Sequence, residues 1–308
     1  MNQRQSPDVR IGIDLGGTKI AAIAFDRDEQ VLFRERVPTP RHDYEGVIQA
    51  IAALVRRAEV AAGVSPERAS VGVGTPGSVS PATGRMQNAN STWLNDMPFK
   101  EDLEAALGRE IRMENDANCL ALSEAHDGAA KGARSVFGVI LGTGVGGGLI
   151  LGGRVITGAN AIGGEWGHNP LPWPKFGEMP GPQCWCGRKG CIETFLSGPA
   201  LEREHLSITR RPLSARDIAE AAARGDEECA ATLERYGDRL ARALAHVVNI
   251  FDPEVIVLGG GLSNITQLYE VLPGLMRKWI FADEPRVDIR PPVHGDASGV
   301  RGAARLWG

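Results

Sequence analysis

Hydrophobic positions follow two periods along this chain, and each period predicts a class of element. Residues 9–25 form two apolar runs separated by a polar, glycine-rich turn, which predicts a β-hairpin. Over residues 47–58 the apolar side chains recur three and four positions apart, which predicts an amphipathic helix. The same patterns predict further strands at residues 31–37, 70–74, 110–113, 136–142, 144–151, 154–158, 255–261 and 287–289, and further helices at residues 98–107, 117–130, 198–204, 214–223, 227–251 and 298–307, with one more helix between the last two strands.

The order of these elements repeats, although no short sequence repeat accompanies it. Each half of the chain is predicted as strand, strand, strand, helix, strand, helix. This order predicts two layered α/β domains with a cleft between them. We assign residues 1–134 to an N-terminal domain, completed by the C-terminal helix 295–308, and residues 135–294 to a C-terminal domain.

Composition and charge narrow the classes of function. The chain has 34 basic and 38 acidic side chains, a net charge of −4, which argues against nucleic-acid binding because a duplex requires clustered cations. Residues 1–10 carry early charges and no apolar segment, so we expect no signal peptide. Residues 135–153 are uncharged but glycine-rich, so we expect a strand and a loop there and no membrane contact. A cytoplasmic protein with reduced thiols is expected.

Glycine is abundant, at 39 of 308 residues, and it gathers in loops that follow predicted strands. Glycine lets backbone N–H groups approach phosphate oxygens, a hydroxyl adds a donor, and a carboxylate can hold hydrated Mg²⁺. Each loop alone is also explained as a tight turn. Because such loops occur in both halves, we predict a nucleotide in the cleft. The predicted nucleotide-binding residues are Asp14, Gly16, Gly17, Thr18, Lys19, Gly142, Thr143, Gly144, Gly259, Gly260 and Gly261.

The second loop also matches the G-x-G-x-x-G motif of dinucleotide-binding oxidoreductases, with Gly142, Gly144 and Gly147. That fold requires a helix directly after the glycines, so that the helix N-terminus faces the pyrophosphate. Residues 149–156 instead predict another hairpin. We therefore set this alternative aside, and a P-loop is excluded because its motif does not occur.

A histidine and three cysteines have the spacing of a metal site. His168, Cys184, Cys186 and Cys191 form the pattern H-x15-C-x-C-x4-C, and Gly187 and Gly190 allow the chain to turn around a small ion. Three thiolates and an imidazole fill a tetrahedral zinc site, so we predict structural Zn²⁺. The alternative is three unrelated reduced cysteines, which rarely cluster so tightly.

Two polar segments of the N-terminal half are candidates for catalysis and substrate binding. Asp116 lies at a predicted helix start, where the helix dipole favours a carboxylate, although a capping role is the common alternative. Gly77 and Asn90 lie in the segments T-P-G and N-A-N-S-T-W-L, which we expect to line a substrate pocket unless both are ordinary loops.

These motifs resemble those of the sugar kinase/actin/Hsp70 ATPase superfamily and, more narrowly, the ROK (repressor, open reading frame, kinase) family, over almost the whole chain. The signature of that family pairs E-x-G-H with C-x-C-G-x-x-G-C-x-E, as found from Glu165 to His168 and from Cys184 to Glu193. The resemblance implies an α/β fold of two actin-like ATPase (ribonuclease H-like) domains flanking an interdomain cleft. It also implies ATP with Mg²⁺, structural Zn²⁺ and a homodimer.

The resemblance assigns roles to individual residues as well. Asp116 would be the general base that accepts the proton of a sugar hydroxyl as it attacks the γ-phosphate, and Asn115 would hold a neighbouring hydroxyl. The implied sugar-binding residues are Gly77, Asn90, Asn115, Asp116, Glu165, His168 and Glu193.

The segment N-A-N-S-T-W-L is most similar to bacterial fructokinases of this family, so the sequence predicts transfer to the 6-hydroxyl of fructose, with mannose or glucose also accepted. The alternatives are an N-acetylglucosamine kinase or a glucokinase of the same family. A sugar-sensing repressor is the non-enzyme alternative, and it is disfavoured because only thirteen residues precede Asp14, too few for a helix-turn-helix domain.

Overall fold

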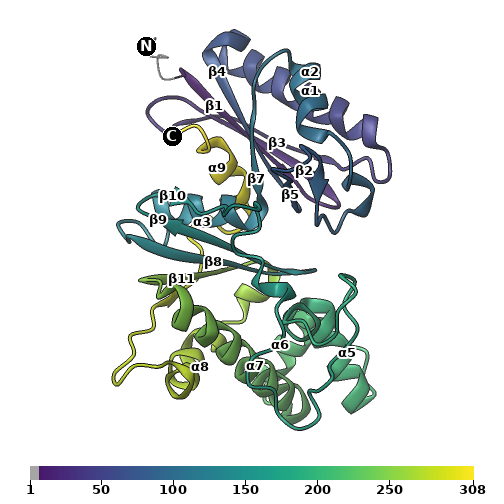
Figure 1. The fold of residues 1–308 in the computed structure, drawn as a ribbon, viewed down its shortest axis with the longest axis vertical. Coiled ribbons are helices and arrows are strands. Elements are labelled where there is room, and N and C mark those ends of the chain that lie inside the picture. Colours follow the sequence, from purple (N-terminus) through teal and green to yellow (C-terminus); the bar gives the residue numbers. More distant parts are fainter. Residues whose placement is uncertain (1–6) are drawn as a thin grey trace. The chain divides into compact units, whose positions relative to one another are not determined.

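The computed structural model describes residues 7–308 (Figure 1). Residues 1–6, on which the expectation of no signal peptide partly rests, lie outside this range. The chain divides into two compact units. Unit 1 contains the chain up to Ser123 together with Val155–Gly163 and Ala297–Gly308, and unit 2 contains Glu124–Arg154 and Gly164–Asp296.

Unit 1 is built on a mixed sheet with the strand order β3-β2-β1-β4-β7. The predicted hairpin is present, with β1 antiparallel to β2, and β4 and β7 continue the sheet in parallel with β1. A separate β5–β6 ribbon accompanies the sheet. The elements are β1 (Val9–Leu15), β2 (Lys19–Phe25), β3 (Val31–Pro38), α1 (Tyr44–Ala62), β4 (Ala69–Thr75), β5 (Ser78–Val79), β6 (Met86–Gln87), α2 (Phe99–Leu107), β7 (Arg112–Asn115), α3 (Asp116–His126) and α9 (Ser298–Ala304).

Both faces of this sheet are covered, because the side chains of β2 alternate between two cores. Ile20 packs in the core with α1 and α2, whereas Ile23 packs against α9. Glycines let α9 approach closely: a Cβ at Gly12 would lie 2.1 Å from Val300 O, and one at Gly72 would lie 1.9 Å from Ala303 O. The C-terminal helix is therefore an integral part of unit 1.

Unit 2 repeats the sheet topology of unit 1, with the strand order β10-β9-β8-β11-β12. Helix α7 packs against α5, α6 and α8, and Figure 1 shows α7 and α8 beneath β8 and β11. The elements are β8 (Ser135–Leu141), β9 (Val145–Leu151), β10 (Arg154–Val155), α4 (Glu193–Leu196), α5 (Gly198–Thr209), α6 (Ala215–Ala223), α7 (Glu227–Phe251), β11 (Val255–Gly259), α8 (Gln267–Met276) and β12 (Ile289–Arg290).

The longer predicted elements coincide with observed ones, and the short strands differ. The strand predicted at residues 110–113 is observed two residues later as β7, and that predicted at 154–158 is reduced to β10. Strand β9 runs antiparallel to β8, so a hairpin and not a helix follows the second glycine loop. The dinucleotide-binding alternative is thereby excluded.

The predicted domain boundary after residue 134 lies inside unit 2, which begins at Glu124. The reason is the carboxylate of Glu124 near the end of α3. It accepts the backbone N–H groups of Ala129 and Val293 at 2.8 and 2.9 Å, so this end of the helix is bonded to unit 2. Among the described residues, none of the helices combines the length and apolar character that crossing a membrane requires.

Candidate active site

The first glycine loop forms the tip of the β1–β2 hairpin in unit 1. The turn is fixed because Gly16 N–H donates to Lys19 O at 3.0 Å and Thr39 Oγ1 donates to Gly16 O at 2.8 Å. A Cβ at Gly17 would meet nothing closer than Ser91 Oγ, at 3.9 Å, and Gly17 does not have a positive φ. The backbone does not require glycine at position 17, as expected where a ligand approaches the main chain. This hairpin carries the predicted residues Asp14, Gly16, Gly17, Thr18 and Lys19.

Asp116 is the first residue of α3 and directly follows β7. The Oδ1 of Asn115 accepts the N–H of Ala117 at 2.9 Å, which is the hydrogen bond of an N-cap residue. The Oδ1 of Asp116 also accepts this N–H, at 2.8 Å. Asn115 is therefore the N-cap and Asp116 the first helical residue, where the helix dipole stabilises its negative charge.

A half-buried carboxyl group supports this helix start. The Oε1 of Glu114 accepts the N–H of Asn115 and the Nδ2 of Asn118, both at 2.9 Å. Burial raises the pKa of Glu114, and these two hydrogen bonds partly oppose the rise. The Nδ2 of Asn115 donates to Gly77 O at 3.2 Å. The structure thus brings Gly77, Asn115 and Asp116 together, and both ends of the Asn115 amide have a structural role.

Packing in the core determines part of the segment on which the fructokinase resemblance depends. Ala89 and Leu94 are fully buried in the core of unit 1. The side-chain amide of Asn95 bonds both the N–H and the carbonyl of Ala89, at 2.9 and 3.0 Å. Asn88, Asn90 and Thr92 are the exposed members of the segment 88–94. Its buried positions therefore report core packing and carry little information on the preferred sugar.

Unit 2 contains a cavity of about 860 Å³, within the usual size of a small-molecule site. The predicted nucleotide-binding residues Gly142, Thr143 and Gly261 lie around it. The other lining residues come from α5, α6 and the segment after β11: Gly198, Pro199, Glu202, Ser214, Ala215, Arg216, Ala219, Glu220, Leu262, Asn264 and Ile265.

The remaining glycines predicted to bind nucleotide do not line this cavity. Gly259 is buried as the last residue of β11. Gly260 has a φ of 80°, and a Cβ there would lie 2.4 Å from Leu141 O, so backbone geometry requires glycine. A Cβ at Gly144 would lie 2.6 Å from the Oε2 of Glu193. These glycines shape the ends of strands beside the cavity.

The predicted metal ligands meet in one cluster of unit 2. The ligand atoms of His168, Cys184, Cys186 and Cys191 all lie within 4.8 Å of one another. Cys186 Sγ lies 3.6 Å from Cys191 Sγ, and Cys184 Sγ lies 3.5 Å from His168 Nδ1. Tetrahedral zinc with Zn–S bonds of about 2.3 Å separates its sulfur ligands by about 3.8 Å, so this donor set fits zinc.

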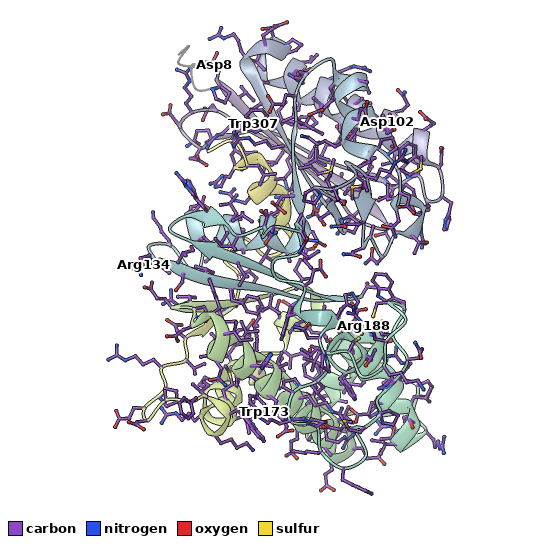
Figure 2. All side chains as sticks on the ribbon, in the orientation of Figure 1. Asp8, Asp102, Arg134, Trp173, Arg188 and Trp307 are labelled. Carbon is purple, nitrogen blue, oxygen red and sulfur yellow. The ribbon has the colours of Figure 1, made fainter. Side chains whose placement is uncertain are left out.

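The chain turns sharply around the cluster. Gly187 and Gly190 have φ values of 88° and 70°, in the left-handed region that favours glycine. Arg188, labelled in Figure 2, lies in this turn, and its carbonyl accepts the N–H of Cys184 at 2.8 Å. The backbone of the candidate metal loop, residues 184–191, thus folds back on itself and brings the predicted ligands together.

The predicted sugar-binding residues of unit 2 adjoin the cluster. Glu165 is half-buried; burial raises its pKa, the neighbouring His168 lowers it, and the Glu193 carboxylate raises it again. His168 faces Cys184 through Nδ1 and meets the ring of Trp185 edge-on, with centroids 5.0 Å apart. Glu165, His168 and Glu193 are therefore near neighbours.

Sequence reasoning missed two features of this region. The cavity residues from α5 and α6, such as Gly198 and Ser214, carry no motif for a ligand, and Ser214 also serves as the N-cap of α6. The second is the hydrogen bond from Trp185 Nε1 to Glu193 Oε1, at 2.7 Å. The one sequence signal for Trp185 is its position between Cys184 and Cys186.

Comparisons with known proteins bear on this site. The sequence matches the model of the ROK family over residues 10–308. An N-acetyl-D-glucosamine kinase from Escherichia coli O6:H1 is 43% identical over 303 residues, covering 96% of this chain and 98% of that protein. An N-acetyl-D-glucosamine kinase from Haemophilus influenzae is 40% identical over 301 residues, with the same coverage. The crystal structure of a ROK hexokinase from Thermus thermophilus has a TM-score of 0.83 and 38% identity, covering 96% of each chain, and it confirms the predicted two-domain α/β fold class.

Proposed function

The chain belongs to the ROK family, and from this premise we propose that it is an ATP-dependent sugar kinase that phosphorylates the 6-hydroxyl of N-acetyl-D-glucosamine. The observation that carries the proposal is the placement of Asp116 at the first position of α3, with capping provided by Asn115. A carboxylate in this position, in a chain similar over nearly its full length to sugar kinases, is suited to act as a base.

In the proposed reaction Asp116 accepts the proton of the attacking sugar hydroxyl, and the oxygen bonds to the γ-phosphorus as the bond to ADP breaks. Backbone N–H groups of the hairpin loop around Gly17 donate to the phosphates. The half-buried carboxylate of Asp14, at the end of β1, has the hard oxygen donors that Mg²⁺ prefers. Mg²⁺ held there with ATP would neutralise charge on the phosphates.

The cavity of unit 2 is the proposed site for the rest of the nucleotide. Its volume of about 860 Å³ and its glycine lining at Gly142 and Gly261 suit a flat base and a ribose that approach the backbone closely. His168 and the three cysteines would hold Zn²⁺ with four protein ligands, which leaves no open position and makes the zinc structural.

The proposed acceptor is N-acetyl-D-glucosamine, whereas the sequence predicts fructose. The prediction of fructose depended on the segment 88–94, in which Ala89 and Leu94 are core residues. Two relatives that are 43% and 40% identical are named N-acetyl-D-glucosamine kinases. The comparisons therefore favour the stated alternative over fructose.

A coupled assay of ADP release tests this proposal directly. N-acetylglucosamine, N-acetylmannosamine, glucose, mannose and fructose are compared, and we expect the largest kcat/KM for N-acetylglucosamine. The variant Asp116→Asn is assayed in parallel, and the turnover that it loses is the turnover catalysed by this chain and not by a contaminating kinase. A larger kcat/KM for glucose or fructose would overturn the acceptor, and no turnover with any sugar would overturn the kinase.

A further inference from the structure

One side chain joins the metal loop to the second glycine loop. Glu193 follows the predicted ligand Cys191 by two positions. Its Oε1 accepts the indole N–H of Trp185 at 2.7 Å, and its Oε2 accepts the backbone N–H of Val145 at 2.9 Å. Both bonds end on a carboxylate, which strengthens them. Two loops that are far apart in the sequence are therefore tied through a single residue.

The second glycine loop is built around this carboxylate. Val145 directly follows Gly144, where a Cβ would lie 2.6 Å from the Oε2 of Glu193, so a larger residue would displace it. On its other side, Gly142 O accepts the N–H of Gly198 at 2.8 Å. The loop that lines the cavity is thus held from two sides, and Glu193 provides one of them.

The position of Trp185 depends on the metal loop. It stands between Cys184 and Cys186, and its side chain is 51% exposed, so little packing holds it. Besides its bond to Glu193, its ring meets edge-on the ring of His168, which is also a predicted metal ligand. An ion that fixes these three ligands also fixes where the indole N–H points.

We propose that Trp185 is a positioning residue that couples the metal loop, through Glu193, to the nucleotide-binding loop at residues 142–145. The metal then sets the affinity for nucleotide without contacting it. The inference rests on the proposed function, because it takes the cavity of unit 2 as the nucleotide site. It adds a second role to Glu193, which the sequence predicts only as a sugar ligand.

The variant Trp185→Phe tests the coupling, because it removes the indole N–H and keeps an aromatic ring beside His168. Binding of ADP and of a non-hydrolysable ATP analogue is measured by calorimetry on the full metal-loaded chain, without sugar, alongside its metal content. We expect about tenfold weaker nucleotide binding, the effect of one lost hydrogen bond to a charged group, with unchanged metal content. The control Trp173→Phe changes a tryptophan of unit 2 that is 40% exposed and stacks on Trp279, and it should bind nucleotide like the parent.

Chelation supplies the second arm of the experiment. Removing the metal from the parent should weaken nucleotide binding by a similar factor, and removing it from Trp185→Phe should add little, because the connection is already broken. The coupling would be overturned by unchanged nucleotide affinity in Trp185→Phe, by an equal loss of affinity in Trp173→Phe, or by loss of the metal from Trp185→Phe. It would also be overturned if chelation and Trp185→Phe weakened nucleotide binding additively. Each of these outcomes leaves the kinase proposal standing. A parent that binds neither nucleotide contradicts the proposed function itself, and the coupling with it.

Discussion

Unit 1 and unit 2 share a sheet topology, yet they hold their functional side chains in different ways. In unit 1, Asp116 lies where a parallel strand passes directly into a helix, and Asn115 and Glu114 fix that junction with hydrogen bonds. In unit 2, the candidate metal ligands lie in a segment dominated by turns and short bridges between η3 (Trp166–His168) and α4.

This difference has a physical consequence. A side chain presented by regular elements over a buried core can be changed without loss of the fold, because the backbone there is held by the sheet and the helix. An irregular segment has fewer backbone hydrogen bonds per residue than a sheet or a helix, so ions and charge pairs contribute more to its stability. We therefore expect substitutions in unit 1 to separate activity from stability, and those in the loops of unit 2 to affect stability first.

The largest effect is expected for Asp116→Asn in unit 1. The amide keeps an oxygen for the N–H of Ala117 but cannot take a proton, so we expect turnover to fall by about 10³-fold, the usual scale for loss of a general base. Nucleotide affinity and the melting temperature should stay near the parent values. Glu101→Gln, which changes an exposed acid in the first turn of α2, is the matched control and should leave all three unchanged. Turnover of Asp116→Asn within tenfold of the parent would contradict the assignment.

The next effect concerns the charge pairs that hold the segment before the metal loop. Glu178 accepts hydrogen bonds from Arg239 and from Arg242, which is fully buried in α7. Burial raises the pKa of Glu178, but the hydrogen bonds from Arg242, the Lys175 N–H and Arg239 together lower it to about 2. Glu178→Gln removes one carboxylate from the buried guanidinium of Arg242, which keeps its ion pair with Asp238, so we expect a loss of about 2–3 kcal/mol in the free energy of unfolding.

The pH dependence of this loss follows from the direction of the shift. Because the pKa is lower in the folded state, the stabilisation by Glu178 is complete above the unfolded pKa of about 4.3 and is lost as the pH falls toward 2. Denaturant unfolding of parent and variant between pH 7 and pH 3 should show the difference shrinking. Glu220→Gln, in the exposed pair with Arg216, is the control and should change stability by no more than about 0.5 kcal/mol. A difference that stays constant down to pH 3 would show that the charge of Glu178 is not responsible.

The same comparison explains which features could be predicted from the sequence. The hairpins and the long helices have strong periodicity, and the three candidate cysteine ligands of the metal cluster share one short segment with turn glycines. The role of Asn115 as a cap, and the bond from Glu193 to Val145, depend on contacts that no local pattern encodes. The short strand β7 was misplaced by two residues, because four residues at the end of a sheet carry too little pattern to set a register.

The glycines illustrate this limit. The sequence predicts nucleotide binding at Gly17 and gives Gly72 no role beyond its place in a strand, and the structure shows different surroundings for the two glycines. A Cβ at Gly72 would lie 1.9 Å from Ala303 O, which is a severe clash. A Cβ at Gly17 would have Ser91 Oγ as its nearest neighbour, at 3.9 Å, which is an ordinary contact. Tertiary contacts, which no local sequence pattern encodes, decide which glycine serves packing and which leaves room for a ligand.

A matched pair of substitutions tests this separation. Gly72→Ala pushes α9 from the sheet, so we expect a loss of about 1–3 kcal/mol in the free energy of unfolding. Gly17→Ala should leave stability unchanged and raise the KM for ATP about tenfold, because a methyl group impedes the approach of phosphate to the backbone. Thermal unfolding and initial rates at varied ATP measure both effects. An unchanged KM in Gly17→Ala would remove the phosphate role of that glycine.

The smallest effect is expected at Glu114, and it distinguishes geometry from charge in unit 1. Burial raises the pKa of Glu114, so its contribution to stability is complete below the unfolded pKa of about 4.3 and is lost as the pH rises through the higher folded value. Glu114→Gln keeps the oxygen that accepts the Asn115 N–H and the Asn118 amide but carries no charge. We therefore expect a change within about 1 kcal/mol, with the variant gaining on the parent as the pH rises from 4 to 7. Glu114→Ala leaves both donors without an acceptor and should lose about 1–3 kcal/mol at every pH. If Glu114→Gln and Glu114→Ala unfold alike in denaturant, the hydrogen bonds of Glu114 do not hold the start of α3, and the contrast between the two units would lose its basis in unit 1.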